Sequence, residues 1–239
     1  MSRQYQNSPI VEALCELRFK PGADSDFTVP GLLYGQIKDK YPRKRANTNV
    51  PPMGVNQVVQ LMSEDERSMV QVAPDMLVVH ALNQYPGWAH LFARIKDVVG
   101  HFRAIAAPTG IQRIGLRYIN HIRTQQRTIR IQDYLLATPC LPSPPIPNEL
   151  RSWVQRSEVE YRHAQGLLAI QTGMAPSVGP DTATLVLDLD FFTPPELALT
   201  LDEALTWVDK AHGELEQAFE ACITDTARAL FGGWGQSND

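Results

Sequence analysis

Residues 7–19, NSPIVEALCELRF, indicate how the fold begins, because two kinds of side chain alternate along them. One set is apolar and comprises Val11, Ala13, Cys15, Leu17 and Phe19. The other set comprises Glu12, Leu14, Glu16 and Arg18. A period of two predicts a β-strand, here over residues 10–19, that buries its apolar face. The opposite face then carries two carboxylates and a guanidinium, which raises the question of what those charges meet.

Length and composition fit a soluble globular protein of one large domain or two small ones. The chain has 239 residues, of which 44% are hydrophobic and 20% are charged. A net charge of −4 argues against a general nucleic-acid binder, which is usually basic. The sequence holds no run of roughly 18 uncharged apolar residues and no apolar stretch typical of a secretion signal. We therefore expect a cytoplasmic protein without a membrane span.

Motifs that would identify an active site or a bound metal do not occur in the sequence. Cys15, Cys140 and Cys222 are far apart, without the spacing of a zinc site or a disulfide framework. The six histidines lack ligand spacing, and there is no nucleophile elbow, phosphate-binding loop or dinucleotide fingerprint. We predict no catalytic residue, no metal and no cofactor from this sequence.

The order of predicted elements repeats once along the chain. For the first half we predict a strand, a helix with apolar positions Leu33, Ile37 and Tyr41, strands at 57–63, 68–73 and 76–82, and a helix striped from Trp88 to Ile105. Residues 43–56 are predicted to form a loop with a basic start. For the second half we predict a strand at 111–122, short helical pieces near 131–137 and 147–154, strands at 156–164, 167–173 and 183–192, and one helix from 201 to 230 of ~45 Å.

This order predicts an α+β fold with a large, mostly antiparallel sheet and long helices packed on one face. We predict a single domain, residues 1–239, with two similar halves at 9–108 and 109–232 related by a pseudo-two-fold axis. The alternative is that any α+β protein of this length offers such a repeat of elements, since the halves share no clear residue identity. A proline-rich loop at 138–148, with five prolines in TPCLPSPPIP, and a flexible tail at 233–239 complete the prediction.

Two motifs carry a resemblance to a known family. Pro9, Ile10, Glu12, Ala13, Glu16, Arg18 and Phe19 fit the signature Pro-Ile-x-Glu-Ala-x-x-Glu-x-Arg-Phe, and RIGLRYIN at 113–120 is similar to a second motif. Both resemble those of a sporadically distributed, uncharacterised family of prokaryotic proteins. The resemblance implies a whole-chain match in length and element order, but no activity. Patchy distribution is associated with mobile-element and defence genes.

The strand that opens the second half carries charges complementary to those of the first strand. Arg113, Arg117 and His121 share one face of it. If the two strands pair, Glu12 and Glu16 are predicted to meet Arg117 and Arg113, which would hold the halves in register. The alternative is a groove, formed by Glu12, Glu16, Arg18, Arg113, Arg117 and His121, that binds an anionic or zwitterionic ligand.

A second set of strand charges keeps a ligand-binding interpretation open. Its members are Glu158, Glu160 and Arg162 in EVEYR, and Asp188 and Asp190 in LDLD. Glu-x-Glu-x-Arg invites comparison with tunnel-shaped triphosphate hydrolases, although the pattern lies late in the chain and ends in Arg. The leading functional hypothesis is a non-enzymatic interaction or ligand-binding module, with a protein partner or as a homodimer. The alternative is a metal-dependent phosphohydrolase or nucleotide-binding protein with a charged barrel interior.

Overall fold

The protein has an α+β fold, as the sequence predicts. A computed structural model describes residues 4–47, 58–139, 152–176, 179, 181–232 and 234–235. In these ranges the main sheet has nine strands, with the order β3-β4-β5-β6-β2-β7-β10-β9-β8. Their bounds are β2 Ile10–Lys20, β3 Arg43–Asn47, β4 Val58–Met62, β5 Ser68–Ala73, β6 Met76–Leu82, β7 Gly110–Thr124, β8 Val154–Tyr161, β9 Gly166–Ala175 and β10 Ala183–Phe192.

The remaining described elements are helices and one small ribbon. The helices are α1 Val29–Ile37, α2 Trp88–Ala106, α3 Leu201–Cys222 and α4 Asp225–Leu230, with 3₁₀ turns η1 Ile131–Asp133 and η2 Arg162–Ala164. The ribbon pairs β1, Gln4–Tyr5, with β11, Trp234–Gly235, and so joins the two ends of the chain. No helix in the described part of the chain is long and apolar enough to span a membrane.

The two strands that begin the halves lie side by side at the centre of the sheet. β2 pairs antiparallel with β7, and Cys15 lies opposite Leu116. Outward from this pair, β6, β5, β4 and β3 follow on one side, and β10, β9 and β8 follow on the other. Apart from β3, which has no counterpart beyond β8, the strand order is the same on both sides of the β2–β7 pair. A duplication of the halves stays a prediction.

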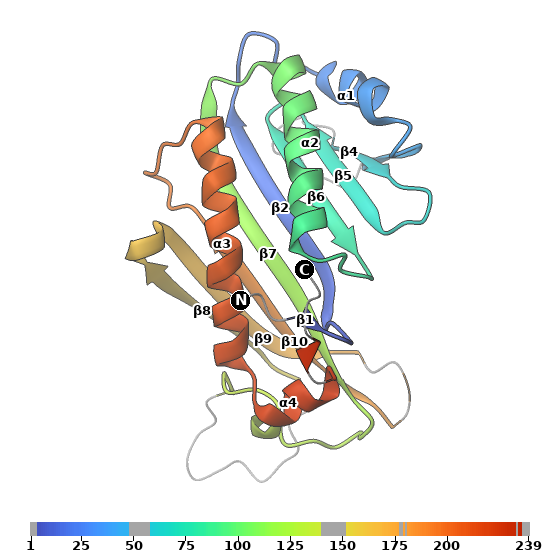
Figure 1. The fold of residues 1–239 in the computed structure, drawn as a ribbon, viewed down its shortest axis with the longest axis vertical. Coiled ribbons are helices and arrows are strands. Elements are labelled where there is room, and N and C mark those ends of the chain that lie inside the picture. The colour runs from blue at the N-terminus through green and yellow to red at the C-terminus, as the bar shows by residue number, and fades with distance from the viewer. Residues whose placement is uncertain are drawn as a thin grey trace.

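The helices form a single layer on one face of the sheet. Figure 1 shows α2 and α3 side by side in front of the central strands, with α1 beside α2. The apolar stripe of α2 is buried at Leu91, Ile95, Val98 and Phe102, and Phe102 stacks on Phe19 of β2 at 4.5 Å between ring centroids. Burying such side chains provides the main favourable free energy of folding.

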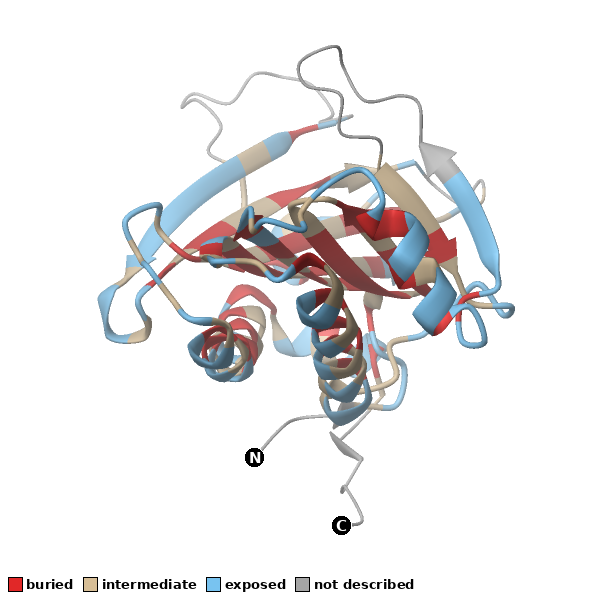
Figure 2. Cartoon of the chain, turned by 90° about the horizontal axis from the view of Figure 1, so that it is seen from above, coloured by how far each residue is buried: buried red, intermediate tan, exposed pale blue. Residues whose placement is uncertain are grey.

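The opposite face of the sheet is concave and has no helix on it among the described residues. Figure 2 shows the mostly exposed edge strands β8 and β3 rising on the side away from α2 and α3. Residues opposite one another in an antiparallel pair share a face. Glu16, Gly115 and Phe192 are opposite in this way, so the charged side of β2 belongs to the concave face.

Two predicted segments differ from the observed elements. Residues 43–47, predicted to start a loop, form β3, because the backbone of β4 offers an open edge and pairing there needs no apolar alternation. The predicted single helix over 201–230 is wrong as well. It breaks at Ile223, whose extended backbone (φ −113°, ψ 155°) makes a bridge to Leu135, and Thr224 caps a new helix, α4.

Other predicted segments are only partly described. Of the predicted proline-rich loop at 138–148, residues 140–148 lie outside the described residues, as do positions 233 and 236–239 of the predicted tail. The helical piece near 131–137 is reduced to the 3₁₀ turn η1, and the end of the piece near 147–154 instead begins β8 at Val154.

Candidate functional site

A cavity of about 640 Å³ lies on the helix side of the sheet, between the start of α2 and the second half of α3. Its floor includes Tyr118 and Asn120 of β7, and its walls include His212 and Glu216 of α3. The segment from Tyr5 to Ile10 closes a third side. Small-molecule sites in proteins commonly have volumes of about 300–1,000 Å³.

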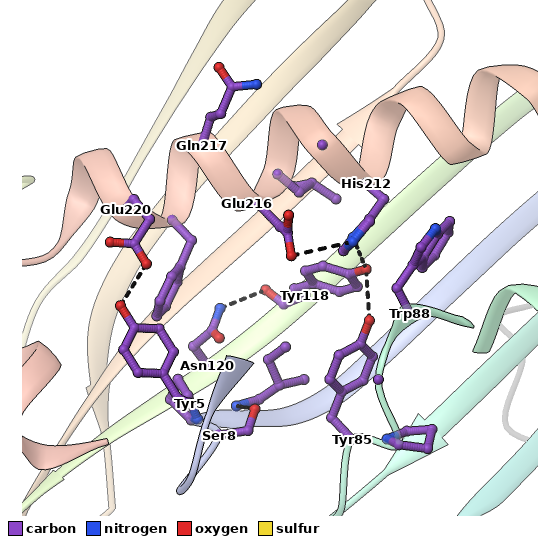
Figure 3. Close-up of a pocket in the computed structure, with 17 residues that line it drawn as sticks. Tyr5, Ser8, Tyr85, Trp88, Tyr118, Asn120, His212, Glu216, Gln217 and Glu220 are labelled. Atoms are coloured by element: carbon purple, nitrogen blue, oxygen red, sulfur yellow. Dashed lines mark hydrogen bonds and ion pairs between the residues drawn. The ribbon is translucent and has the colours of Figure 1, made fainter. Parts of the chain in front are cut away.

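A chain of polar contacts crosses one end of the cavity (Figure 3). The hydroxyl of Tyr118 lies 3.2 Å from the hydroxyl of Tyr85 and 2.8 Å from Nδ1 of His212. Nε2 of His212 in turn lies 3.4 Å from Oε1 of Glu216. Four side chains from the β6–α2 loop, β7 and α3 are therefore held in fixed relative positions.

Trp88 forms the wall beside His212. It lies there because the chain turns sharply just before α2 begins. Gly87 adopts φ 87°, a conformation that side-chain-bearing residues rarely adopt, and so turns the chain directly into the helix. The indole of Trp88 stacks on the imidazole of His212 at 4.3 Å and on Phe92 at 5.0 Å. Its Nε1 donates to Asp209 of α3 at 2.8 Å, which links the two long helices.

Tyr5 closes the other end of the cavity, opposite Trp88 in Figure 3. Its ring packs on Phe219 and Phe231, and its hydroxyl donates to Glu220 at 2.6 Å. Burial and the neighbouring Glu220 raise the pKa of Tyr5 to about 12. Nε of Arg228 in α4 donates to the same carboxylate at 2.8 Å, so α4 supports this wall.

Burial sets the protonation of the groups along the cavity. It raises the pKa of Tyr85 to about 12 and raises the pKa of Tyr118 well above its usual value, so both remain phenols at neutral pH. Burial also lowers the pKa of His212 below 6.5, although Glu216 and Asp209 act in the opposite direction. The imidazole is therefore neutral near pH 7, and the site offers neutral donors and acceptors.

Both acidic side chains among the described lining residues come from α3. Glu216 and Glu220 supply carboxylates, and none of the described residues that line the cavity is lysine or arginine. His212, Glu216 and Glu220 recur at every fourth position and so share one face of α3. The arrangement can hold a compact ligand between aromatic rings and offer it hydrogen-bond acceptors.

The charged strand residues that the sequence pattern points to lie on the concave face of the sheet. This is the face opposite the one that holds the cavity. Nη1 of Arg113 donates to Glu16 at 2.9 Å, and Nη2 of Arg113 lies 3.4 Å from Asp190. Arg18 also donates to Glu16, at 2.8 Å. A Cβ on Gly115 would come within 3.1 Å of the Arg113 guanidinium, so the glycine leaves room for this cluster.

The predicted pairing of Glu12 with Arg117 is not found. Nε of Arg117 donates to Asp188 at 2.7 Å, and Nη2 makes a second bond to the same carboxylate. Glu12 instead lies 2.7 Å from Nδ1 of His80, a contact that lowers the pKa of Glu12. The reason is strand order, because β10 flanks β7 on the side away from β2 and offers Asp188 to Arg117.

The other predicted residues are dispersed. Glu158 and Glu160 lie on edge strand β8, where each pairs locally, Glu158 with Arg156 at 2.5 Å and Glu160 with Arg162 at 3.1 Å. They therefore do not join Asp188 and Asp190 in one site. His121 lies on the concave face near Arg123, and burial lowers its pKa. Within the described ranges, no group of three or more His, Cys, Asp or Glu side chains has the geometry of a metal site.

Comparison with known proteins assigns no function to these features. Neither a scan against protein-family models nor a search of curated proteins found a match to this chain. The pattern of the sequence does not reveal the cavity, because its lining residues come from separate segments of the chain. The fourfold spacing of His212, Glu216 and Glu220 is the signal that could have pointed to a polar helix face.

Proposed function

We propose that this protein is a non-enzymatic ligand-binding module whose ligand occupies the cavity between α2 and α3. The observation that carries the proposal is a cavity of about 640 Å³ with a mixed aromatic and polar lining fixed by hydrogen bonds. Such pre-formed sites bind small molecules with little reorganisation. Action with a partner protein, in the mobile-element or defence context of the resembling family, is part of the proposal.

The protonation of the lining favours binding over covalent catalysis. The pKa values of Tyr85 and Tyr118 are raised by burial, so neither hydroxyl provides a nucleophilic phenolate near pH 7. Both ring nitrogens of His212 already have contacts, with Tyr118 and with Glu216. These groups can orient a ligand without a change of covalent bonds.

The concave face supports a structural role for its charges over the alternative phosphohydrolase. Arg113 and Arg117, the central guanidiniums, each contact carboxylates of neighbouring strands. A phosphate bound there would have to displace Glu16 or Asp188 and would lie close to these carboxylates. Paired charges of this kind fix the register of strands.

A matched pair of glycine substitutions tests the cavity. Gly213 lines the cavity, and a Cβ placed on it would meet no other atom within 4 Å, so Gly213→Leu is expected to extend into the space. Gly100 of α2 is equally open but does not line the cavity. Both changes replace glycine by a better helix former, which favours the helix by somewhat less than about 1 kcal/mol, so we expect both variants to fold.

The measurement is ligand-induced thermal stabilisation across a panel of small aromatic compounds of positive, negative and zero charge. We expect at least one compound to stabilise the wild type and Gly100→Leu but not Gly213→Leu. Stabilisation that is equal in all three proteins, or absent from the wild type across the panel, would contradict the proposal.

A further inference from the structure

The side chain of Asn120 is buried in the floor of the cavity, and its hydrogen bonds fix which way the amide group points. Only 1% of the residue is exposed. Its Nδ2 donates to the backbone carbonyl of Leu187 at 3.0 Å and to that of Tyr118 at 3.3 Å. Because carbonyl oxygens only accept hydrogen bonds, turning the amide over would place its oxygen against two acceptors. The other amide atom, Oδ1, therefore has a fixed position.

Oδ1 of Asn120 is an acceptor that no donor satisfies. No group in the described part of the chain donates to it, and it is not among the unpaired side-chain atoms that are sealed from solvent. Since Asn120 lines the cavity, the cavity is where this oxygen is open to a ligand. A side chain that is almost completely buried thus presents one unused acceptor to the space beside it.

The other polar groups of the cavity floor are matched to one another. Nε2 of His212 faces the carboxylate of Glu216, so the neutral imidazole carries its proton there and accepts at Nδ1 from the hydroxyl of Tyr118. The hydroxyl of Tyr85 then donates to that of Tyr118. All three donors of this chain have acceptors within it, whereas Oδ1 of Asn120 has no donor in the described part of the protein.

Apolar and aromatic groups surround the acceptor. Ile10 lies opposite Asn120 in the β2–β7 pair and also lines the cavity. Leu215 and Phe219 of α3 contribute to the lining, and Figure 3 shows the amide between the rings of Tyr5 and Tyr118. Sites of this composition enclose the body of a ligand with apolar groups, and the few polar groups fix its orientation. A planar ring can pack offset or edge-to-face against such side chains.

Resting on the proposed ligand-binding function, we infer that the cavity selects an aromatic ligand with an N–H or O–H group on its edge, which donates to Oδ1 of Asn120. The apolar lining holds the ring, and the amide sets its orientation. A ligand of the same shape without this donor is disfavoured, because it would leave the buried oxygen unpaired. The donor, rather than a net charge, is the feature that the site recognises.

The test uses three uncharged probes of similar shape, titrated calorimetrically into the full-length protein at pH 7. Indole has a ring N–H, benzofuran has an oxygen at the same position, and 1-methylindole has its nitrogen blocked by a methyl group. We expect indole to bind about tenfold more tightly than either of the others, a factor typical of one hydrogen bond to a buried acceptor. This comparison on the wild type does not depend on any variant.

A pair of variants assigns the preference to Asn120. Asn120→Leu removes the acceptor at similar volume and is expected to reduce the preference for indole over benzofuran to within about twofold. The control is Thr172→Val in β9, which removes an equally buried, unpaired side-chain oxygen outside the lining. It is expected to keep the wild-type preference.

Equal affinities of the wild type for indole and benzofuran, no binding of indole, or a preference that survives in Asn120→Leu would overturn the inference. The glycine pair judges the proposed cavity separately. If benzofuran binds as tightly as indole and Gly213→Leu blocks both, the ligand-binding function is retained and the selection for a donor is excluded.

Discussion

At the scale of single residues, Arg117 shows that the pattern of charges along a strand does not predict which residue each charge will pair with. The sequence places Glu12 and Arg117 on adjoining strands of the same face, yet Arg117 binds Asp188 on its other side. Asp188 is the more buried partner, with 7% of its side chain exposed against 39% for Arg117. A two-point bond to a buried carboxylate fixes the guanidinium plane and excludes other arrangements.

A double-mutant cycle tests this assignment. We expect Arg117→Ala and Asp188→Ala to show a coupling of about 1 kcal/mol in the free energy of unfolding, a modest value because Arg117 is partly exposed. The matched cycle of Glu12→Ala with Arg117→Ala should show less than about half that value, because Glu12 contacts His80. Urea unfolding of the six proteins measures both couplings, and a larger coupling to Glu12 would refute the assignment.

The cavity residues illustrate a different limit of sequence analysis. Tyr85, Trp88, Tyr118 and His212 come from three separate segments. Only the tertiary fold brings their polar atoms together. The sequence places Trp88 on an apolar helix stripe, but it does not predict that these four residues enclose a space.

At the scale of elements, the break between α3 and α4 supports the end of the cavity near Tyr5. The turn at Ile223 and Thr224 lets α4 fold back, so Arg228 reaches Glu220 on α3. The apolar stripe continues through the break, which is why its period predicted one helix. Thr224 signals a possible cap, but a threonine within a long apolar pattern is no proof of a helix end.

Removal of the cap is expected to weaken this end of the molecule. Thr224 accepts a hydrogen bond from the backbone N–H of Ala227 at 3.3 Å and donates to the carbonyl of Asp133 at 2.5 Å. Thr224→Ala should lower the free energy of unfolding by about 1 kcal/mol, whereas Thr224→Ser, which keeps the hydroxyl, should lower it much less. Equal losses in the two variants, measured by chemical denaturation, would show that the hydroxyl bonds do not stabilise the break.

The short strand β3 shows that the local sequence pattern does not always predict strand pairing. β3, with the sequence RKRAN, has neither apolar alternation nor β-branched residues, and it is a strand because β4 pairs with it. By contrast, β2, β7 and β10 have long alternating patterns and lie almost where the sequence predicts them. Strand length and burial on one face explain the difference.

At the scale of the whole molecule, the sheet separates two sites of different character. The concave face carries charges that contact one another across β2, β7 and β10 (Figure 2). The helix face holds the cavity, where α2 and α3 leave a space that the segment from Tyr5 to Ile10 closes. The sequence predicts the α+β class from periodicity and element order, and it raises the pairing of β2 with β7 only as the condition under which their charges would meet. It does not predict which face holds a ligand.

The most direct test of the account is a crystal structure of the protein with a compound that stabilises it in the thermal panel. The account predicts this compound in the cavity between α2 and α3, in contact with Trp88 or Tyr118. The compound bound on the concave face beside Asp190, with the cavity lacking it, would contradict the account.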